Sequence, residues 1–241
     1  MKTGLSVCVM LTTMLLGILA SPVRAERFET ISTDELLAVR KGAAPFLLIN
    51  ALSPIEYNQE AISDSVNIPA SHMRPHHHLL PEDKSTLLIF YCKGIRCTKS
   101  RRAARRAMEF GYEKVKIYTA GLPGWKERGL PVSHFTSYPE IDPLVMDPLA
   151  VYKSMESALL LDIRGEEVSQ VGEIKQAVKI PLDDLDRHYE QLPPDRPIII
   201  IDHAGKQSPI CARFLYKMGY RDLAILKGGM INWVRAGLPV K

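Results

Sequence analysis

The chain has 241 residues, of which 46% are hydrophobic and 24% are charged, and its formal net charge is +4 at pH 7. This length can form one large domain or two domains of about 100–120 residues each. The charge is too small to indicate binding to nucleic acid or to a membrane surface, and four cysteines are too few for a disulfide scaffold.

The first 25 residues are typical of a secretory signal. Lys2 supplies a positive start, residues 5–20 form an apolar run without charge, and Ala25 ends a stretch of small residues at which cleavage can occur. An uncleaved anchor is the alternative, because residues 3–23 are uncharged and could just span a bilayer. We predict cleavage, a periplasmic or secreted protein, and no stable membrane association afterwards.

Cleavage after residue 25 would leave three cysteines, Cys92, Cys97 and Cys211. In an oxidising compartment an odd number of thiols means that at least one is free, bridged between molecules or derivatised. The sequence therefore indicates a reactive thiol.

Short apolar runs alternate with helical patterns along the rest of the chain. The apolar runs, which predict buried strands, cover residues 46–49, 87–91, 115–118, 159–163, 197–201 and 223–226. Helical spacing covers residues 100–110 and 209–218, and each pattern is followed by a glycine that can cap a helix. Runs that are apolar throughout are typical of a parallel sheet covered by helices on both faces, so we predict an α/β fold.

The chain contains an internal repeat. Gly111-Tyr112 and Trp125 recur 108 residues later as Gly219-Tyr220 and Trp233. Further upstream, Pro69 and Pro181 close matching tripeptides at an offset of 112. This regular spacing indicates a duplication. The predicted organisation is a signal peptide at 1–25, a first domain at 26–134, a linker at 135–148 and a second domain at 149–241.

Both copies resemble the rhodanese homology domain, over nearly all of residues 30–241. The resemblance rests on an entry motif, Asp162-Ile163-Arg164 in the second copy and Asn50-Ala51-Leu52 in the first, and on the closing pattern of glycine, tryptophan and Gly-Leu-Pro-Val. It implies two rhodanese-like domains, each a small parallel sheet with helices on both faces. It also implies sulfurtransferase activity at a loop between the central strand and the following helix.

The first loop, as we call residues 92–100, has a cysteine in the family's first position. The resemblance implies that Cys92 is the catalytic nucleophile and carries sulfur as a persulfide. Backbone amides at a helix N-terminus and nearby cations would lower the pKa of a thiol placed there. The alternative is a buried structural thiol. We expect the substrate to bind the turn that follows, which consists of Lys93, Gly94, Ile95 and Arg96.

Cys97 gives this loop a Cys-x-Gly-x-x-Cys pattern that departs from the family. It is either a resolving thiol, which attacks a persulfide or closes a disulfide with Cys92, or an inert residue at the helix start. Cys211 lies within a helical pattern and is predicted to belong to the core. We expect no metal and no other cofactor, because two sulfurs lack further ligands at a usual spacing and the run His76-His77-His78 is typical of polar surface.

The second loop, residues 202–208, is two residues shorter and lacks the nucleophile. Asp202 replaces the cysteine and Gln207 replaces the arginine, so the second copy is predicted to be catalytically silent. Asp162 and Arg164 are expected to form an ion pair for which the first copy has no counterpart.

The function predicted from these features is an exported sulfurtransferase. It would move sulfane sulfur from a small sulfur anion, thiosulfate or a persulfide, to an unidentified thiol or protein acceptor through a Cys92 persulfide. Two alternatives stay open. One is a low-turnover sulfur-binding or interaction module, and the other is thiol–disulfide exchange through Cys92 and Cys97.

Overall fold

A computed structural model describes residues 28–241. The predicted signal peptide, residues 1–25, lies outside the described residues. Within the described part of the chain no helix is both long and apolar enough to cross a membrane.

The first domain is a parallel five-stranded sheet in the order β1-β6-β5-β2-β4. Its strands and helices are β1 (Glu29–Ile31), α1 (Thr33–Lys41), β2 (Phe46–Asn50), α2 (Pro54–Gln59), β3 (Ala61–Ile62), β4 (Val66–Asn67), β5 (Leu87–Tyr91), α3 (Lys99–Glu109), β6 (Val115–Tyr118), α4 (Gly121–Glu127) and β7 (Val132–Ser133). The short strands β3 and β7 form a separate antiparallel pair.

The second domain repeats this topology. Its parallel sheet has the order β8-β12-β11-β9-β10, so each strand takes the place of its counterpart in the first domain. Its elements are β8 (Leu144–Met146), α5 (Pro148–Lys153), β9 (Leu159–Asp162), β10 (Val178–Lys179), α6 (Leu185–His188), β11 (Ile198–Ile201), α7 (Ser208–Lys217), β12 (Leu223–Leu226) and α8 (Gly229–Arg235). The predicted α/β class, parallel sheets and duplication are thereby confirmed.

Successive side chains of the central strands point to opposite faces of each sheet and contribute to a hydrophobic core on each face. In β5, Leu88 and Phe90 pack under α3, whereas Ile89 and Tyr91 pack with α1 and α4 on the opposite face. In the second domain α6 and α7 cover one face, and α5 and α8 cover the other. Both tryptophans, Trp125 and Trp233, are buried, and the thiol of Cys211 is buried as predicted.

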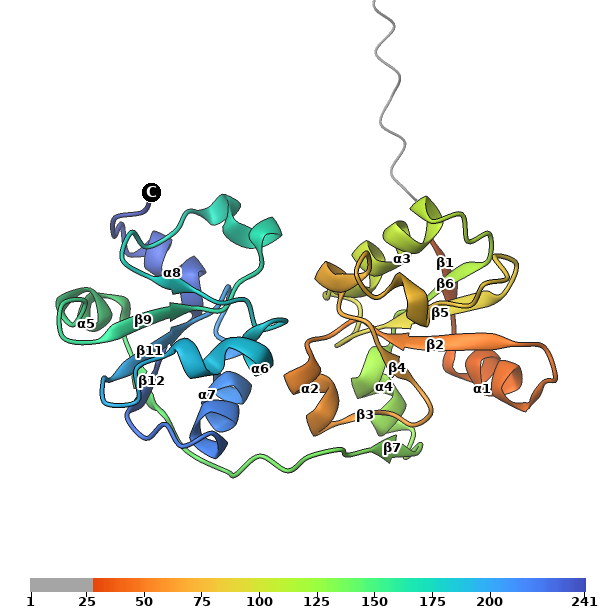
Figure 1. Ribbon diagram of the computed structural model, residues 1–241, viewed down its shortest axis with the longest axis horizontal. Coiled ribbons are helices and arrows are strands. Elements are labelled where there is room, and N and C mark those ends of the chain that lie inside the picture. The colour runs from red at the N-terminus through yellow and green to blue at the C-terminus, as the bar shows by residue number, and fades with distance from the viewer. Residues whose placement is uncertain (1–27) are drawn as a thin grey trace, which may run out of the picture.

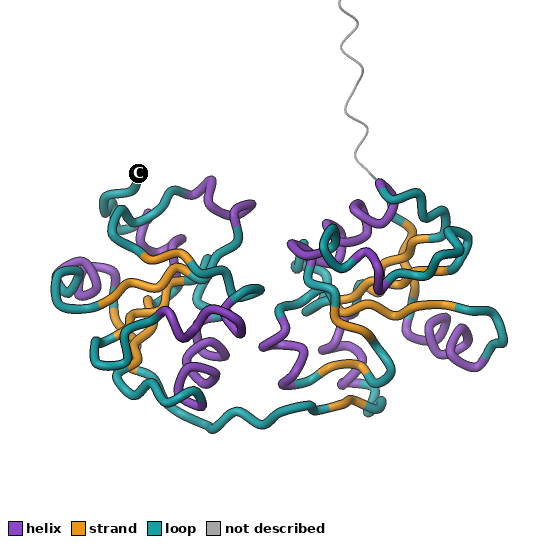
Figure 2. The backbone as a smooth tube through the Cα atoms, in the orientation of Figure 1, coloured by secondary structure: helices purple, strands orange, loops and turns teal. Residues whose placement is uncertain are grey.

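The predicted linker is too long at its C-terminal end. Residues 144–146 form β8, which pairs with β12, so the second sheet begins before residue 149. The first residues of the segment also remain attached to the first domain, since the amides of Phe135 and Thr136 donate to the carbonyl oxygen of Asn58. The remaining connection runs along one side of both domains (Figures 1 and 2).

The two domains face each other through α2 of the first and α6 and α7 of the second (Figure 1). The side chain of Ile55, on α2, is completely buried within the core cluster of the second domain. Two hydrogen bonds join the domains nearby, from Ser71 Oγ to Asp183 Oδ2 (2.6 Å) and between His72 Nε2 and Asp184 Oδ1 (2.9 Å). The first and second loops, at the carboxyl ends of β5 and β11, therefore lie against a shared interface.

Candidate active site

Cys92 directly follows β5 and its side chain is buried. The residue is only 1% exposed. Its thiol donates to Ser100 Oγ at 3.3 Å, and the carbonyl oxygen of Cys97 lies 3.6 Å from the sulfur. The neighbouring Cys97 side chain, together with burial, raises the pKa of Cys92 above its ordinary value. Cys92 is thus held as the protonated partner of the pair.

Cys97 is partly exposed, and its pKa is shifted in the opposite direction. The Cys92 side chain, the backbone amides of Lys99 and Lys93 and the charge of the Lys99 ammonium all favour a thiolate on Cys97. The Cys92 side chain has the largest of these effects, and together they outweigh burial and lower the pKa of Cys97 to about 6. The backbone amides expected to surround Cys92 therefore stabilise a thiolate on Cys97 instead. Both cysteines are free thiols.

A cavity of about 290 Å³ opens between the domains in front of this pair. Both loops contribute to its wall, and Cys97 lines it whereas Cys92 does not. Its lining includes six cationic residues and three carboxylates, namely Lys93, Arg96, Lys99, Arg102, Arg164 and Lys206 against Glu56, Asp183 and Asp202. The excess of positive charge suits a small anion.

A network of ion pairs and hydrogen bonds joins Lys93 and Lys99 of the first loop to carboxylates of both domains. Lys99 Nζ lies 2.7 Å from Asp183 Oδ1, in the second domain, and 3.8 Å from Glu56 Oε2. Lys93 Nζ lies 2.7 Å from Glu56 Oε1, and Gln207 Nε2 donates to Glu56 Oε2 at 3.3 Å. Although burial opposes ionisation, Lys99 and Lys93 lower the pKa of Glu56 to about 2. The carboxylate is therefore ionised at neutral pH and fixes both lysines beside the cavity.

The four residues predicted to bind substrate divide into two pairs. Lys93 and Arg96 line the cavity. Gly94 has a φ of 98°, which lets the chain turn, and Ile95 is exposed to solvent, but neither contributes to the cavity wall. The cationic half of the prediction thus lies where an anion would bind.

The second loop surrounds its own carboxylate. Asp202 accepts hydrogen bonds from the backbone amides of Gly205, Gln207 (2.5 Å) and Ser208 (2.8 Å). A negative group therefore occupies the turn of amides that the first loop directs toward Cys97. The predicted ion pair of this domain is confirmed, since Arg164 Nη2 lies 2.7 Å from Asp162 Oδ2 and both side chains are buried.

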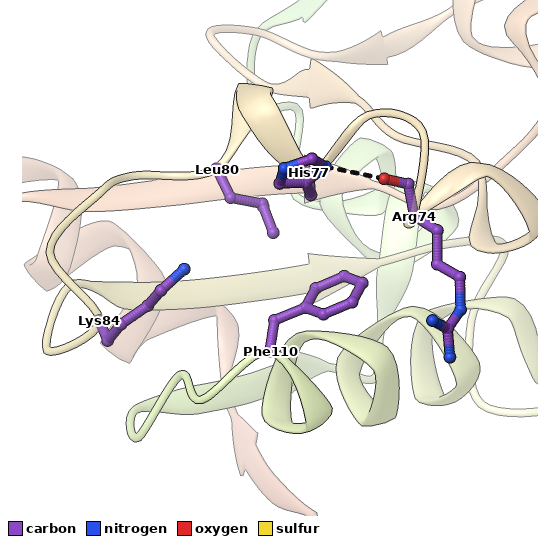
Figure 3. Close-up of a pocket in the computed structure, with 5 residues that line it drawn as sticks. All are labelled: Arg74, His77, Leu80, Lys84 and Phe110. Atoms are coloured by element: carbon purple, nitrogen blue, oxygen red, sulfur yellow. Dashed lines mark hydrogen bonds between the residues drawn. The ribbon is translucent and has the colours of Figure 1, made fainter.

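Another cavity, of about 430 Å³, lies on the first domain alone (Figure 3). Its lining residues are Arg74, His77, Leu80, Lys84 and Phe110, none of which belongs to either loop. His77 Nδ1 is hydrogen-bonded to the Arg74 carbonyl oxygen. Among the described residues, no cluster of three or more histidine, cysteine or acidic side chains is arranged to hold a metal ion.

Sequence reasoning missed three members of the site, Glu56, Lys99 and Asp183. Glu56 lies near the entry motif and Lys99 lies in the first loop. A charged residue close to a motif was the only, weak, sequence signal for each. Asp183 gave none, because its role arises only from the way in which the two domains pack.

Comparisons with known proteins agree with the fold. The pattern of the Rhodanese-like domain family matches residues 32–128 and 147–236. A sulfurtransferase of Allochromatium vinosum is 33% identical over 85 residues, which are 35% of this chain and 79% of that protein. The thiosulfate sulfurtransferase GlpE of Vibrio cholerae is 29% identical over 100 residues, which are 41% of this chain and 94% of that protein. Each relative aligns with about one domain's length.

Among solved structures, a thiosulfate sulfurtransferase from Pseudomonas aeruginosa resembles the chain over 89% of its length, with 20% identity and a TM-score of 0.43. The matched region is 43% of that protein, so the chain spans less than half of its length.

Proposed function

This chain belongs to the rhodanese-like domain family, and on that premise we propose that it transfers sulfane sulfur through a cysteine persulfide in the first loop. The donor is thiosulfate or a persulfide, and the acceptor is a thiophilic small molecule or a protein thiol. The observation that carries the proposal is the Cys97 thiol at the wall of a cationic cavity between the domains, with Cys92 buried beside it in the same loop, its sulfur 3.6 Å from the Cys97 carbonyl oxygen.

The transfer takes place in two displacements. A thiolate of the loop attacks the outer sulfur of thiosulfate, the sulfur–sulfur bond breaks, and sulfite leaves with the bonding electrons. The acceptor then attacks the outer sulfur of the persulfide and releases the thiolate. Lys93 and Arg96 are positioned to hold the anionic donor, and the amides of Lys93 and Lys99 favour negative charge on the loop sulfur.

The sequence assigns the persulfide to Cys92, which occupies the family position. The burial of Cys92 and the position of Cys97 at the cavity wall support a broader version, in which the two thiols form one reactive unit. The second domain supplies the opposite wall and, with Asp202 in place of a cysteine, carries no sulfur in this proposal.

The test is release of sulfite from thiosulfate and formation of thiocyanate when cyanide is the acceptor. The wild-type protein should release sulfite in proportion to the protein present, and the double variant Cys92→Ser/Cys97→Ser should release none. Cys211→Ala is the matched control, because it removes a thiol that is buried in the second domain. Equal sulfite release from the double variant would contradict the proposal.

The presence of two free thiols in one loop, with Cys92 Sγ 3.6 Å from the Cys97 carbonyl oxygen, also favours a second candidate, thiol–disulfide exchange through Cys92 and Cys97. Incubation of the reduced protein with a small disulfide should then produce a Cys92–Cys97 disulfide, identified by peptide mapping. If both thiols stay reduced or form only mixed disulfides, this second candidate is excluded.

Export is proposed from the sequence alone, on the signal pattern of residues 1–25. The N-terminal residue of protein recovered from an extracytoplasmic fraction tests it. Glu26 is the expected first residue, whereas an N-terminus at Met1 would contradict cleavage.

A further inference from the structure

We propose that the interdomain cavity binds an organic persulfide that bears a carboxylate, and that the second domain recognises this carboxylate through Lys206. This inference rests on the proposed sulfur transfer and names the class of its donor. The reacting sulfurs of the donor lie at Cys97, which lines the cavity, and the carboxylate lies at the second loop. The second domain thereby selects the substrate of the first.

The cavity has room for more than an inorganic ion. Its volume of about 290 Å³ is close to the lower end of the roughly 300–1,000 Å³ that is usual for pockets of organic ligands. Part of its wall is apolar and consists of Leu52, Val168, Pro181 and Leu182. Thiosulfate has no apolar part to cover these side chains, whereas the carbon skeleton of an organic persulfide can pack on them.

Two cations of the cavity wall have no partner in the protein. Among residues 28–241, the side chains of Arg96 and Lys206 form neither an ion pair nor a hydrogen bond. One belongs to the first loop and the other to the second, so each wall offers a positive charge that a ligand can neutralise. Three other lining cations are already held by carboxylates at 2.7 Å, in the pairs Lys93–Glu56, Lys99–Asp183 and Arg164–Asp162.

The two unpaired cations suit different parts of one ligand. Arg96 directly precedes Cys97 in the chain, so its charge suits the reacting sulfurs. Lys206 lies in the opposite loop and suits a negative group that is remote from them. A single ammonium matches a singly charged carboxylate. A phosphate is disfavoured, because Asp183 and Asp202 also line the cavity and repel its second charge.

The second loop presents Lys206 from a fixed backbone. The amides on either side of it, those of Gly205 and Gln207, both donate to the carboxylate of Asp202. The Gln207 side chain also donates to Glu56 Oε2 at 3.3 Å, and the same carboxylate pairs with the first loop. Glu56 thus ties the two loops together across the cavity. Asp202, which cannot carry sulfur, positions the loop that binds the donor.

The transfer from such a donor is balanced. A thiolate of the first loop attacks the outer sulfur of the donor, and the sulfur–sulfur bond of the donor breaks. The organic thiolate leaves with the bonding electrons, while the outer sulfur and its proton remain on the loop as a persulfide. One sulfur atom passes between two thiolates, so no oxidant or reductant is consumed.

The experiment compares two donors that differ only in the group to be recognised, the persulfides of N-acetylcysteine and of N-acetylcysteine amide. Thiocyanate formation with cyanide as acceptor, corrected for the rate without protein, gives kcat and KM for the full chain. Wild type should prefer the carboxylate donor in kcat/KM by about tenfold. Lys206→Gln should lose most of this preference, chiefly through a higher KM for the carboxylate donor, and Lys206→Arg should keep it.

Lys153→Gln is the matched control. It removes the same charge from an exposed position at the end of α5, which does not line the cavity. This variant should keep the wild-type preference. Because the ratio of the two donors is compared between variants, any intrinsic difference in their reactivity cancels.

Three outcomes would overturn the inference: equal use of the two donors by wild type, an undiminished preference in Lys206→Gln, or an equal loss of preference in Lys153→Gln. In each case, sulfite release from thiosulfate by wild type would show that the proposed sulfur transfer stands. If wild type transfers sulfur from neither persulfide nor from thiosulfate, the proposed function itself fails.

Discussion

The ammonium of Lys99, two residues after Cys97, lies 2.7 Å from the carboxylate of Asp183 in the other domain. Asp183 also accepts a hydrogen bond from Ser71 of the first domain. A side chain of the second domain thereby fixes a largely buried cation whose charge favours a thiolate on Cys97. The second domain is in this sense a part of the site.

Because Lys99 and Asp183 form this ion pair, substitutions of the two residues should have non-additive effects on the free energy of unfolding. Removing one partner leaves the other charge partly buried without its closest ion-pair partner, so Lys99→Met and Asp183→Asn should each lower the free energy of unfolding by about 1–3 kcal/mol. The double variant should cost clearly less than the sum, with a coupling of about 1 kcal/mol or more. Urea unfolding of the four proteins measures it.

The exposed pair of Arg128 and Asp34, also separated by 2.7 Å, is the control. A solvated ion pair contributes little, so its coupling should stay below about 1 kcal/mol. Equal coupling energies in the two pairs would mean that Asp183 stabilises Lys99 no more than an exposed ion pair would.

The alkylation rate of Cys97 should rise with pH through a midpoint near 6, because its pKa is about 6 and only the thiolate reacts. An ordinary thiol would show the rise near roughly 8.5. Since the Cys92 side chain is the largest cause of the lowered pKa, Cys92→Ala should move the midpoint upward, and Cys92→Ser, which keeps a polar hydrogen, should move it less. Iodoacetamide labelling followed by mass spectrometry gives the profile. A midpoint unchanged in Cys92→Ala would show that the two thiols are not coupled.

Glu56 should make stability depend on pH under acidic conditions. Its pKa of about 2 in the folded protein lies below its ordinary value of 4.5. A carboxyl group with a lowered folded-state pKa stabilises the fold above its unfolded pKa, and this contribution is lost as pH falls from about 4.5 toward 2. The loss should amount to about 2–4 kcal/mol.

Glu56→Gln should remove that part of the acid dependence, as measured by urea unfolding at several pH values. Glu82→Gln changes an exposed carboxylate and should leave the profile as in wild type. If Glu56→Gln retains the full acid dependence, the ion pairs of Glu56 with Lys93 and Lys99 do not stabilise the fold.

Gly121 should tolerate no side chain, because the loop packs on it. Its φ is 61°, and an added Cβ would lie 2.3 Å from the Cys92 carbonyl oxygen and 2.5 Å from the Gly94 nitrogen. Gly121→Ala should therefore displace the first loop, lower stability by more than about 2 kcal/mol and reduce sulfite release at least about tenfold. Thermal unfolding and the thiosulfate assay test both effects.

Gly129 provides a closely matched comparison for that substitution. Its φ is 63°, but a Cβ there would meet nothing within 4 Å. Gly129→Ala should cost only the backbone strain, about 1–2 kcal/mol, and leave sulfite release unchanged. If the two variants have the same stability and the same sulfite release, the contact between Gly121 and the first loop does not contribute to function.

Most of the fold could be predicted from the sequence because its central strands are apolar throughout. Of the predicted strands, 87–91, 115–118 and 223–226 have the bounds of β5, β6 and β12. Strand β8 was missed because it lies at a sheet edge, exposes Leu144 and Val145, and is preceded by prolines. An exposed edge strand of three residues lacks the pattern by which a buried strand is identified.

The site was predictable only where its chemistry is local. Cys92, Lys93 and Arg96 follow from the loop motif, and the lack of a cysteine in the second loop can be read at Asp202. That Cys97 lines the cavity while Cys92 is buried depends on the path of the two extra residues in the first loop. The spacing of residues in the sequence does not determine that path. The contact of Lys99 with Asp183 depends on how the domains pack, and no local pattern encodes that.

The two contacts that join the domains beside this site have a further meaning. Ser71 bonds to Asp183, and His72 bonds to Asp184. In each pair the residues are 112 positions apart, which is the offset of the repeat at this point, so each residue touches its own counterpart. Self-complementary contacts of this kind arise at a two-fold axis, as in isologous homodimers. The fused chain thus has the symmetry of a dimer whose two loops face one shared cavity, and the different residues of the two loops make the opposite walls of that cavity chemically different.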